Sequence, residues 1–263
     1  MIAKPKKSLG QNFLKDSNVL TKIINLGSLT ESDIILEIGP GTGNLTEFIL
    51  QKKPKKFHVI EKDERLINNL KKKFDKKLII INEDILRYDL KSLSDKDLVI
   101  FGNLPYNISS QILANFIYYS YSEFSYKKLV LMFQKEVADR ILAEENSKNY
   151  GRLSIFSSWK LNIKKIMDIS PSSFFPKPKV MSSLLIFEPK INYIKFKNSK
   201  NLEHITNVFF NQRRKMIKKP INILFKDSKE IIDKLDLNIN LRPQNLRKET
   251  YYKICSIYEK LIK

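Results

Sequence analysis

The stretch Glu37-Ile38-Gly39-Pro40-Gly41-Thr42-Gly43 continues a short apolar run, Ile34–Ile38, and is followed by a segment with helical spacing. Glycine lets the backbone turn tightly and lets a ligand approach without a clash against a Cβ atom. A helix that begins here would offer unpaired backbone N–H groups to a polar ligand. The stretch therefore predicts a strand, a glycine-rich turn and a helix at a ligand site, although many kinds of nucleotide-binding protein carry such a turn.

Short apolar runs alternate with amphipathic stretches of helical length from about residue 33 to residue 133. In one such stretch, Arg65–Phe74, Leu66, Leu70 and Phe74 fall on one helical stripe. This alternation is typical of right-handed strand–helix–strand crossovers and a parallel sheet. It predicts an α/β fold with a doubly wound, Rossmann-like sheet. The strands, which we expect to be buried on both faces, are Ile34–Ile38, Phe57–Ile60, Leu78–Ile81, Leu98–Phe101 and Leu129–Phe133.

The spacing of apolar residues changes after Pro189 and becomes helical. We therefore predict two domains, residues 1–190 with the sheet and residues 191–263 as a small helical domain, with a boundary near residues 189–198. Two apolar runs before the boundary, Leu153–Trp159 and Ser182–Phe187, predict further strands that can lie antiparallel at one edge. The expected helices after the boundary are near Leu202–Phe210, Ile221–Phe225, Glu230–Leu235 and residues 251–262.

Composition excludes several classes of protein. A hydrophobic content of 42% can fill a core, and a single cysteine, Cys255, excludes a disulfide framework or a cysteine-built metal site. The two histidines, His58 and His204, are far apart in the chain, so we expect no metal. The N-terminus lacks the apolar core of a signal peptide, and no uncharged apolar run has the length of a membrane span. We expect a cytoplasmic protein without a membrane partner.

The net charge of +20 is the strongest compositional signal. Such an excess favours a polyanionic partner, with nucleic acid first and an anionic membrane surface second. The alternative explanation is a genome bias towards Lys, Asn and Ile. Residues 191–263 hold 17 basic and 7 acidic residues, so half of the excess charge lies in these 73 residues. The predicted C-terminal domain is therefore a basic module.

Two acidic residues follow neighbouring strands of the predicted sheet. Glu61 comes at the end of the second strand, 22 residues after Gly39, where a carboxylate can accept from both hydroxyls of a ribose. Asp84 follows the third strand and can accept from the amino group of an adenine. The alternative is that both are ordinary surface acids at strand ends. Together with the glycine-rich turn, they predict a site for an adenine nucleoside cofactor, which a dehydrogenase would share.

A third motif, Asn103-Leu104-Pro105-Tyr106, lies at the end of the fourth strand, at the edge where ligands bind in such sheets. It resembles the loop of enzymes that methylate exocyclic base nitrogens, and leucine at the second position indicates the branch that acts on RNA adenine. This loop argues against a dehydrogenase. The carboxamide of Asn103 and the backbone carbonyl of Leu104 can accept the two N–H bonds of an adenine amino group and orient its nitrogen.

With these residues the chain resembles the bacterial small-subunit rRNA adenine dimethyltransferases of the rRNA adenine dimethylase family. The resemblance implies S-adenosylmethionine as cofactor, a sheet of seven strands and no metal. Other matching segments are Gly10–Leu14, Gln134–Val137, Tyr150–Ser154, Phe175–Val180 and Phe210–Lys215. One departure is Gln244, where the family pattern has Glu, and we expect its effect on local structure and not on chemistry.

The resemblance assigns roles residue by residue. Asn12 and Leu14 would cover the methionine end of the cofactor, together with Gly39 and Asn103. Tyr106 and Phe174 would stack on the two faces of a base that has left its helix. The implied cofactor residues are Gln11, Asn12, Leu14, Gly39, Gly41, Gly43, Glu61, Asp84 and Asn103. The implied catalytic residues are Asn103, Leu104, Pro105, Tyr106 and Phe174.

RNA contacts are expected on the basic module. Its densest cluster comprises Arg213, Arg214, Lys215, Lys218 and Lys219, and Arg152 and Lys148 would extend it. The resemblance implies small-subunit rRNA or an assembling small ribosomal subunit as partner, a role in subunit biogenesis, and a monomer. Two alternatives stay open: a large-subunit rRNA methylase of the erythromycin-resistance type, and an assembly or transcription factor in which methylation is secondary.

Overall fold

The structure is a computed structural model that describes residues 4–93, 95–119 and 124–261. Its contacts divide the chain into two compact units. The first unit comprises residues 1–138 and 163–189, and the second comprises residues 139–162 and 190–263, as far as these are described. No helix in the described ranges is long and apolar enough to cross a bilayer.

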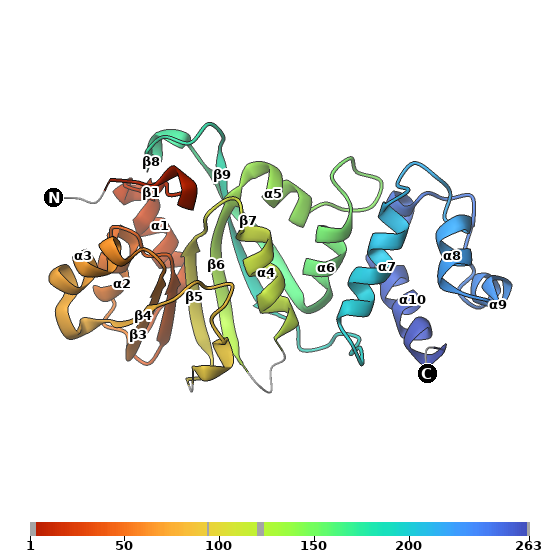
Figure 1. The fold of residues 1–263 in the computed structure, drawn as a ribbon, viewed down its shortest axis with the longest axis horizontal. Coiled ribbons are helices and arrows are strands. Elements are labelled where there is room, and N and C mark those ends of the chain that lie inside the picture. The colour runs from red at the N-terminus through yellow and green to blue at the C-terminus, as the bar shows by residue number, and fades with distance from the viewer. Residues whose placement is uncertain (1–3, 94, 120–123, 262–263) are drawn as a thin grey trace. The chain divides into compact units, whose positions relative to one another are not determined.

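A seven-stranded mixed sheet forms the centre of the first unit, with the strand order β4-β3-β2-β5-β6-β9-β7 (Figure 1). The five strands from β4 to β6 run parallel, and β9 is antiparallel to β6. This confirms the α/β class, the doubly wound Rossmann-like sheet and the seven strands. The bounds are β2 Ile34–Ile38, β3 Lys56–Glu61, β4 Ile79–Asn82, β5 Leu98–Asn103, β6 Tyr126–Gln134, β7 Leu161–Ile169 and β9 Ser182–Pro189.

Register places the ends of the parallel strands level with one another. Ile38 at the end of β2 lies opposite Ile60 of β3 and Gly102 of β5, and Glu61 lies opposite Asn82 of β4. The backbone N–H of Gly39 donates to the carbonyl of Ile60 over 2.9 Å, which continues the pairing into the turn. The residues that follow β2, β3, β4 and β5 therefore meet at one edge of the sheet.

Helices flank this sheet. Their bounds are α1 Ser17–Gly27, α2 Asn44–Leu50, α3 Glu64–Phe74, α4 Ser109–Tyr118 and α5 Lys135–Ile141, with short 3-10 helices at Lys7–Leu9, Asp75–Lys77, Leu90–Ser92 and Pro171–Ser173. Local chemistry fixes two helix starts, because the carboxylate of Asp16 accepts from the backbone N–H of Asn18 and that of Asp63 accepts from the N–H of Arg65. The apolar stripe of α3 is buried against β3 and β4, as predicted.

Two strand predictions were wrong. The run Leu153–Trp159 forms a helix, α6 (Arg152–Lys160), which is buried on nearly all sides and therefore shows no helical period in its sequence. The strand β4 is not buried on both faces, because it lies at the sheet edge and its Ile79 is 47% exposed.

A second, two-stranded sheet joins the N-terminal segment to a distant part of the first unit. Strand β1 (Phe13–Leu14) pairs antiparallel with β8 (Phe174–Phe175), so that Phe13 lies opposite Phe175 and Leu14 opposite Phe174 (Figure 1). Alternation along such short strands sends Leu14 and Phe174 into the core, while Phe175 is 60% exposed. Sequence periodicity gave no indication of strands this short.

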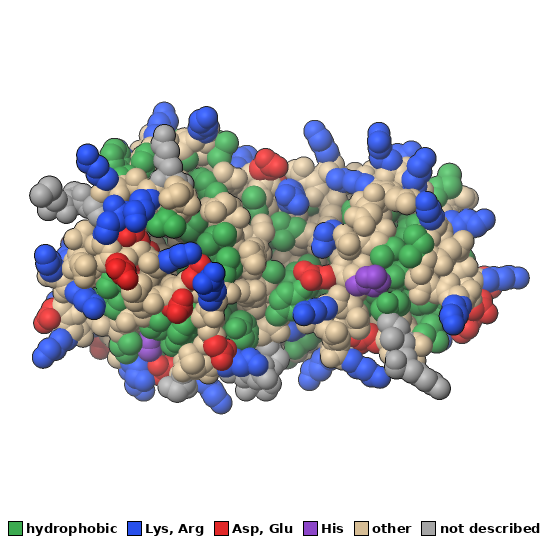
Figure 2. Space-filling model, viewed as in Figure 1, with side chains coloured by type: hydrophobic (Ala, Val, Ile, Leu, Met, Phe, Trp, Pro, Cys, Tyr) green, Lys and Arg blue, Asp and Glu red, His purple; other side chains and the backbone are tan. Residues whose placement is uncertain are grey.

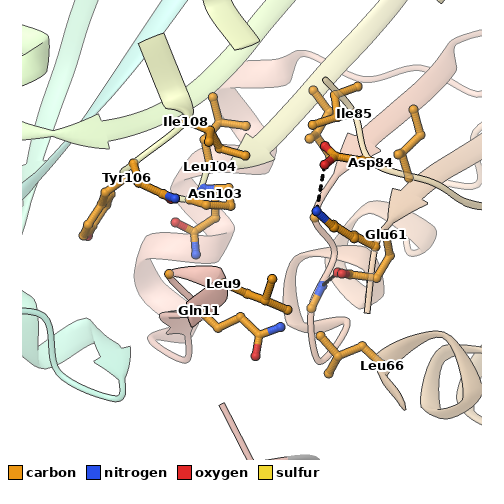
Figure 3. Close-up of a pocket in the computed structure, with 18 of the residues that line it drawn as sticks. Leu9, Gln11, Glu61, Leu66, Asp84, Ile85, Asn103, Leu104, Tyr106 and Ile108 are labelled. Atoms are coloured by element: carbon orange, nitrogen blue, oxygen red, sulfur yellow. Dashed lines mark hydrogen bonds and ion pairs between the residues drawn. The ribbon is translucent and has the colours of Figure 1, made fainter. Parts of the chain in front are cut away.

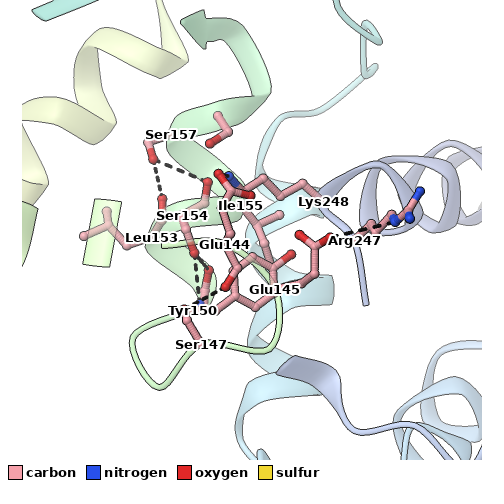
Figure 4. A network of polar contacts seen from close by, with 12 residues as sticks. Glu144, Glu145, Ser147, Tyr150, Leu153, Ser154, Ile155, Ser157, Arg247 and Lys248 are labelled. Carbon is pink, nitrogen blue, oxygen red and sulfur yellow. Dashed lines mark hydrogen bonds and ion pairs between the residues drawn. The ribbon is translucent and has the colours of Figure 1, made fainter. Parts of the chain in front are cut away.

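The second unit is helical. Besides α6 it contains α7 Lys200–Phe210, α8 Lys218–Leu224, α9 Ser228–Lys234 and α10 Lys248–Leu261, with a 3-10 helix at Pro243–Asn245. Buried tyrosines connect its parts, since the Tyr150 hydroxyl donates to the carbonyl of Leu246 and the Tyr252 hydroxyl to that of Ile155. A polar network surrounds these contacts, including the ion pair between Lys248 and Glu144 (Figure 4).

The division of the chain differs from the predicted one at residues 139–162. The sequence assigned this segment to the sheet domain, whereas in the structure it belongs with the C-terminal helices. The reason is packing: the indole of Trp159 stacks on Phe196 at 4.7 Å between ring centroids, and its Nε1 donates to the carbonyl of Ile194. The later break, at Pro189, falls within the expected boundary region.

Candidate active site

A cavity of about 200 Å³ lies in the first unit, at the edge where the parallel strands end. Figure 3 shows Asn103 and Tyr106 on one side of it, with Glu61 and Asp84 on the opposite side. Leu9 and Gln11, from the N-terminal segment, line it as well. Segments that are far apart in sequence therefore converge on one hollow.

The three glycines of the turn play different parts. All have a positive φ, at 64° for Gly39, 60° for Gly41 and 78° for Gly43, which favours glycine at each position. A Cβ atom on Gly39 would meet nothing within 4 Å, so this glycine leaves open space beside the cavity, whereas one on Gly41 would press on the Phe13 ring at 2.8 Å. Gly43 does not line the cavity. A Cβ there would clash with Phe74 at 2.5 Å, so Gly43 allows α3 to pack against the turn.

Glu61 is a buried acid at the end of β3. Its side chain accepts from two backbone N–H groups, that of Asp63 over 2.9 Å and that of Gly41 over 3.2 Å. Burial raises the pKa of Glu61, and these two hydrogen bonds oppose the rise by stabilising the carboxylate. Because only 7% of the residue is exposed, Glu61 is not an ordinary surface acid.

Asp84 faces the same cavity with a partner that sequence reasoning missed. The Nζ of Lys62 donates to Asp84 Oδ2 over 2.8 Å, and the backbone N–H of Leu86 donates to Oδ1 over 3.0 Å (Figure 3). The lysine contact is the main reason why the pKa of Asp84 is lowered. Lys62 also lines the cavity, beside Asp84. The only sequence feature that could have pointed to Lys62 is its position directly after Glu61.

A carboxylate at the start of α3 anchors the N-terminal segment. Asp63 accepts from Gln11 Nε2 over 3.1 Å and from Arg65 Nη2 over 2.6 Å, and its pKa is lowered to about 2, mainly by the arginine. The backbone N–H of Lys6 in turn donates to Gln11 Oε1 over 2.7 Å. Gln11 thus lines the cavity with both ends of its amide engaged.

Asn103 ends β5 with its amide oriented by the N-terminal segment. Its Nδ2 donates to the backbone carbonyl of Asn12 over 2.7 Å. In the described ranges no donor pairs with Asn103 Oδ1, so this oxygen is left to accept from a ligand. Three residues on, the hydroxyl of Tyr106 is hydrogen-bonded to Ser182 Oγ at 2.7 Å, which fixes the tyrosine ring at the cavity wall. Leu104 and Pro105 line the same wall.

The sequence comparisons agree with this geometry. The family model for ribosomal RNA adenine dimethylase matches residues 2–260 of the chain. The chain belongs to the ribosomal RNA adenine dimethylase family. This confirms the resemblance that the glycine turn and the Asn103–Tyr106 loop indicated.

Relatives within the dimethylase family cover the chain from end to end. Ribosomal RNA small subunit methyltransferase A of Pelagibacter ubique (strain HTCC1062) is 57% identical over 261 residues, which is 99% of each chain. The protein of the same name from Prochlorococcus marinus (strain AS9601) is 40% identical over 95% of this chain and 94% of its own.

Two solved structures resemble the fold of this chain. A dimethyladenosine transferase from Plasmodium falciparum superposes with a TM-score of 0.80 at 29% identity, over 94% of this chain and 98% of its own. The 23S rRNA methyltransferase ErmE has a TM-score of 0.69 at 18% identity, over 94% of this chain and 99% of its own, which shows the shared fold alone.

A second buried carboxyl of the dimethylase chain, Glu37, lies at the end of β2 before the glycine turn. It is 2% exposed, and Thr46 Oγ1 donates to its Oε2 over 2.7 Å. Burial, helped by the nearby charge of Glu61, raises the pKa of Glu37 to about 8. Glu37 is therefore mostly protonated at neutral pH. The motif contains this residue, but sequence reasoning assigned it no role.

Leu14 and Phe174 are buried and do not line the main cavity, although Leu14 lines a small hollow together with Gly39 and Asn103, its expected neighbours. Leu14 is 4% exposed, and its carbonyl accepts from Asn44 Nδ2 over 2.6 Å. Phe174 is 2% exposed and packs in the same core cluster, so it presents no ring face to a base in this structure. Side chains alternate along β8, so Phe174 points into the core and the next residue, Phe175, is the exposed one.

The residues of the basic cluster in the second unit have two kinds of environment in the structure. Arg213 is half-buried, with Nε donating to Gln244 Oε1 over 3.1 Å and Nη2 to the carbonyl of Lys148 over 2.5 Å. Gln244, the departure from the family pattern, is thus a local structural partner. The exposed cations Arg214, Lys215, Lys218 and Lys219, together with Arg242, line a surface hollow of about 610 Å³. Arg152 is exposed at the start of α6.

Proposed function

We propose that this protein transfers methyl groups from S-adenosylmethionine to the exocyclic N6 of two adjacent adenosines near the 3′ end of small-subunit rRNA, giving N6,N6-dimethyladenosine. The observation that carries the proposal is the convergence of the Asn103–Tyr106 loop and the Glu61–glycine-turn pair on one cavity. The names of the relatives support the small subunit as substrate rather than the large one.

The residues of the cavity fit S-adenosylmethionine. Glu61 is a buried carboxylate with the acceptor oxygens that ribose hydroxyls require, and Asp84 offers oxygens to the amino group of an adenine. Leu66 and Ile85 supply apolar walls, and the open space at Gly39 leaves room for close approach. The bound cofactor would supply a methyl group that is already electrophilic, because it is attached to a sulfonium.

The chain's own task is to prepare a poor nucleophile. The exocyclic nitrogen of adenine shares its lone pair with the ring, so it is flat and weakly nucleophilic. Asn103 Oδ1 and the carbonyl of Leu104 accept its two N–H bonds, which orients the nitrogen and favours its pyramidal form as charge develops. The hydrogen bond from Asn103 Nδ2 to Asn12 holds the amide the correct way round. The nitrogen that has gained a methyl group is acidic and releases its proton to water, so no strong base is needed.

The base must leave its helical stack to reach Asn103. Tyr106, held by Ser182, offers an aromatic wall on which the base stacks. Stacking tolerates a second methylation, since monomethyladenine keeps its ring face although it has lost one N–H. The partner is then an unpaired region of small-subunit rRNA, bound by the exposed cations of the second unit, and the protein works as a cytoplasmic monomer in subunit biogenesis.

Nucleoside analysis tests the proposed function. Purified protein, S-adenosylmethionine and small ribosomal subunits with unmethylated adenosines should give N6,N6-dimethyladenosine, detected by mass spectrometry and mapped by primer extension to adjacent adenosines. The Asn103→Ala variant should give none in the same time. Dimethyladenosine found on large-subunit rRNA alone would identify the erythromycin-resistance type of activity. No product from either subunit, with the cofactor bound normally, would favour an assembly factor.

A further inference from the structure

A second hollow lies in the first unit, separate from the cavity at the strand ends. It has a volume of about 590 Å³ and is lined by the N-terminal segment, the start of α2, the last turns of α3 and the end of β8. Its lining residues include Lys15, Asn44, Asn69, Lys72, Lys73 and Phe175. None of these belongs to the cofactor or catalytic set described above.

Phe175 gives this hollow an exposed aromatic surface. Its side chain is 60% exposed, because the pairing of β8 with β1 directs the preceding Phe174 into the core. Phe13, the residue paired with it, also lines the hollow. The two rings together give the hollow an aromatic lining on which a flat ligand can stack.

The charge of the hollow is positive. Within the described ranges no carboxylate pairs with Lys15 or Lys72, and both side chains are exposed. Lys73 is partly neutralised by Glu47, whose carboxylate it contacts at 2.7 Å. No acidic residue is among those that line the hollow in the described part of the chain, and the amide of Asn69 has no hydrogen-bond partner there. The surface thus combines free cations, an amide and an aromatic ring.

Phe13 links the hollow to the catalytic cavity. It lines both, and its ring lies so close to Gly41 that a Cβ added there would be 2.8 Å from it. The residue before it, Asn12, accepts the hydrogen bond that orients Asn103. A ligand in the hollow therefore contacts the same short segment that closes the cavity and holds the catalytic amide.

We propose that this hollow is a second RNA subsite, which holds an unpaired nucleotide from the strand that carries the target adenosine. Its base stacks on Phe175, its phosphate lies between Lys15 and Lys72, and Asn69 hydrogen-bonds to either. Base–aromatic stacking beside a basic groove is how proteins hold single strands with little sequence preference. A substrate with two adjacent target adenosines has to stay bound while each base in turn enters the cavity, and such a subsite holds the strand meanwhile. The identity of the strand rests on the proposed function.

The test measures RNA affinity and methylation separately. The RNA is a labelled fragment of the 3′ end of small-subunit rRNA that contains the two adenosines, with affinity measured by fluorescence anisotropy on the whole chain of 263 residues. Phe175→Ala should weaken binding about 5- to 100-fold, the range for loss of one base–aromatic stack. Phe175→Trp should restore it, and Lys15→Gln with Lys72→Gln should weaken it and flatten its salt dependence. Calorimetry should give an unchanged affinity for S-adenosylmethionine in all variants.

Matched controls keep the result specific. Ile79→Ala removes another exposed apolar side chain from the first unit, and the pair Lys52→Gln and Lys55→Gln removes two exposed cations outside the hollow. If Phe175→Ala binds the fragment as tightly as the Ile79→Ala control, the subsite is refuted. If only binding to the assembled subunit suffers, while binding to the fragment is unchanged, the hollow contacts a ribosomal protein and the proposal fails. If the wild type binds the fragment through Phe175 but methylates no adenosine, the subsite stands and the proposed function fails.

Discussion

The candidate catalytic cavity of the first unit and the basic hollow of the second unit hold polar groups in opposite ways. Around the cavity, Glu61, Asp63 and Asn103 are each tied by hydrogen bonds from neighbouring segments. In the basic hollow, Arg214, Lys215, Lys218 and Lys219 are exposed and make no ion pair among the described residues. The difference fits the proposed function, in which orienting a nitrogen needs fixed atoms and attracting phosphates needs only charge.

The charge itself does not separate the two units. Lys and Arg side chains are spread over the visible surface of both, as Figure 2 shows. The excess of +10 in residues 191–263 equals the excess in the rest of the chain. The second unit gathers five cations around its hollow, whereas three lysines line the second hollow of the first unit. The predictions below test whether fixed groups and free charges behave as differently as this comparison implies.

The largest effect is expected from Asn103→Ala. Loss of the acceptor that orients the nitrogen should slow methyl transfer roughly a hundredfold or more, as for loss of one transition-state hydrogen-bond partner. The affinity for S-adenosylmethionine should fall far less, because Glu61 and Asp84 remain. Single-turnover methylation beside calorimetry separates the two quantities. Near-normal turnover in the variant would remove Asn103 from the catalytic set.

The next effect concerns the free charges. Replacing Arg214, Lys215, Lys218 and Lys219 by Gln should flatten the dependence of log RNA affinity on log salt, by about 0.7 to 0.9 for each phosphate that the protein no longer neutralises. A control lacking Lys52, Lys53, Lys55 and Lys71 of the first unit should keep a steeper slope. Equal slopes in the two variants would mean that diffuse charge, and not this hollow, binds the RNA.

Arg213 is a control for these four exposed cations. Because its guanidinium is bonded to Gln244 and to the carbonyl of Lys148, Arg213→Gln should lower the thermal stability of the chain and leave the salt slope nearly unchanged. A change of slope as large as that of a neighbouring lysine variant, without loss of stability, would place Arg213 with the free charges.

A smaller effect is expected from Glu61→Ala, which tests a fixed group directly. Losing a charged acceptor for ribose hydroxyls costs on the order of 1.5–3 kcal/mol, or about ten- to a hundredfold in cofactor affinity. Turnover at saturating S-adenosylmethionine should largely recover. Calorimetry gives the cofactor affinity, and a titration of turnover against cofactor concentration gives the rate at saturation. An unchanged affinity would contradict the ribose role.

The last prediction concerns stability and not binding or turnover, and it is a pH dependence that arises from Glu37. Its folded-state pKa of about 8 lies above the value of an unfolded chain, so its contribution to stability is complete at low pH and is lost as pH rises towards 8. The slope for one proton is about 1.4 kcal/mol per pH unit. Denaturant unfolding of wild type and Glu37→Gln between pH 5 and pH 8 should show a shallower decline in the variant, which keeps the hydrogen bond from Thr46. Parallel curves would mean that Glu37 is ionised in the fold.

Much of the fold and part of the site could be predicted without coordinates. The strands from β2 to β6 were evident because buried parallel strands appear as short apolar runs. Glu61, Asp84 and Asn103 were found because each lies at or just after the end of such a strand, and parallel strands end at one edge. The partners of these residues were not found, since Lys62, Asp63 and Ser182 carry no distinguishing local pattern.

The sequence by itself determined the α/β class, the glycine turn and the acids and amide at the strand ends, because these depend on local periodicity and on positions along single strands. Tertiary structure alone decided what depends on a partner distant in the chain. The pairing of β8 with β1 buried Phe174 and exposed Phe175. Contacts with Gln244 and Lys148 made Arg213 a structural residue, and burial on nearly all sides left Leu153–Trp159 without the periodic pattern that would have predicted a helix. In each case the deciding energy comes from neighbours in space, which no window of sequence contains.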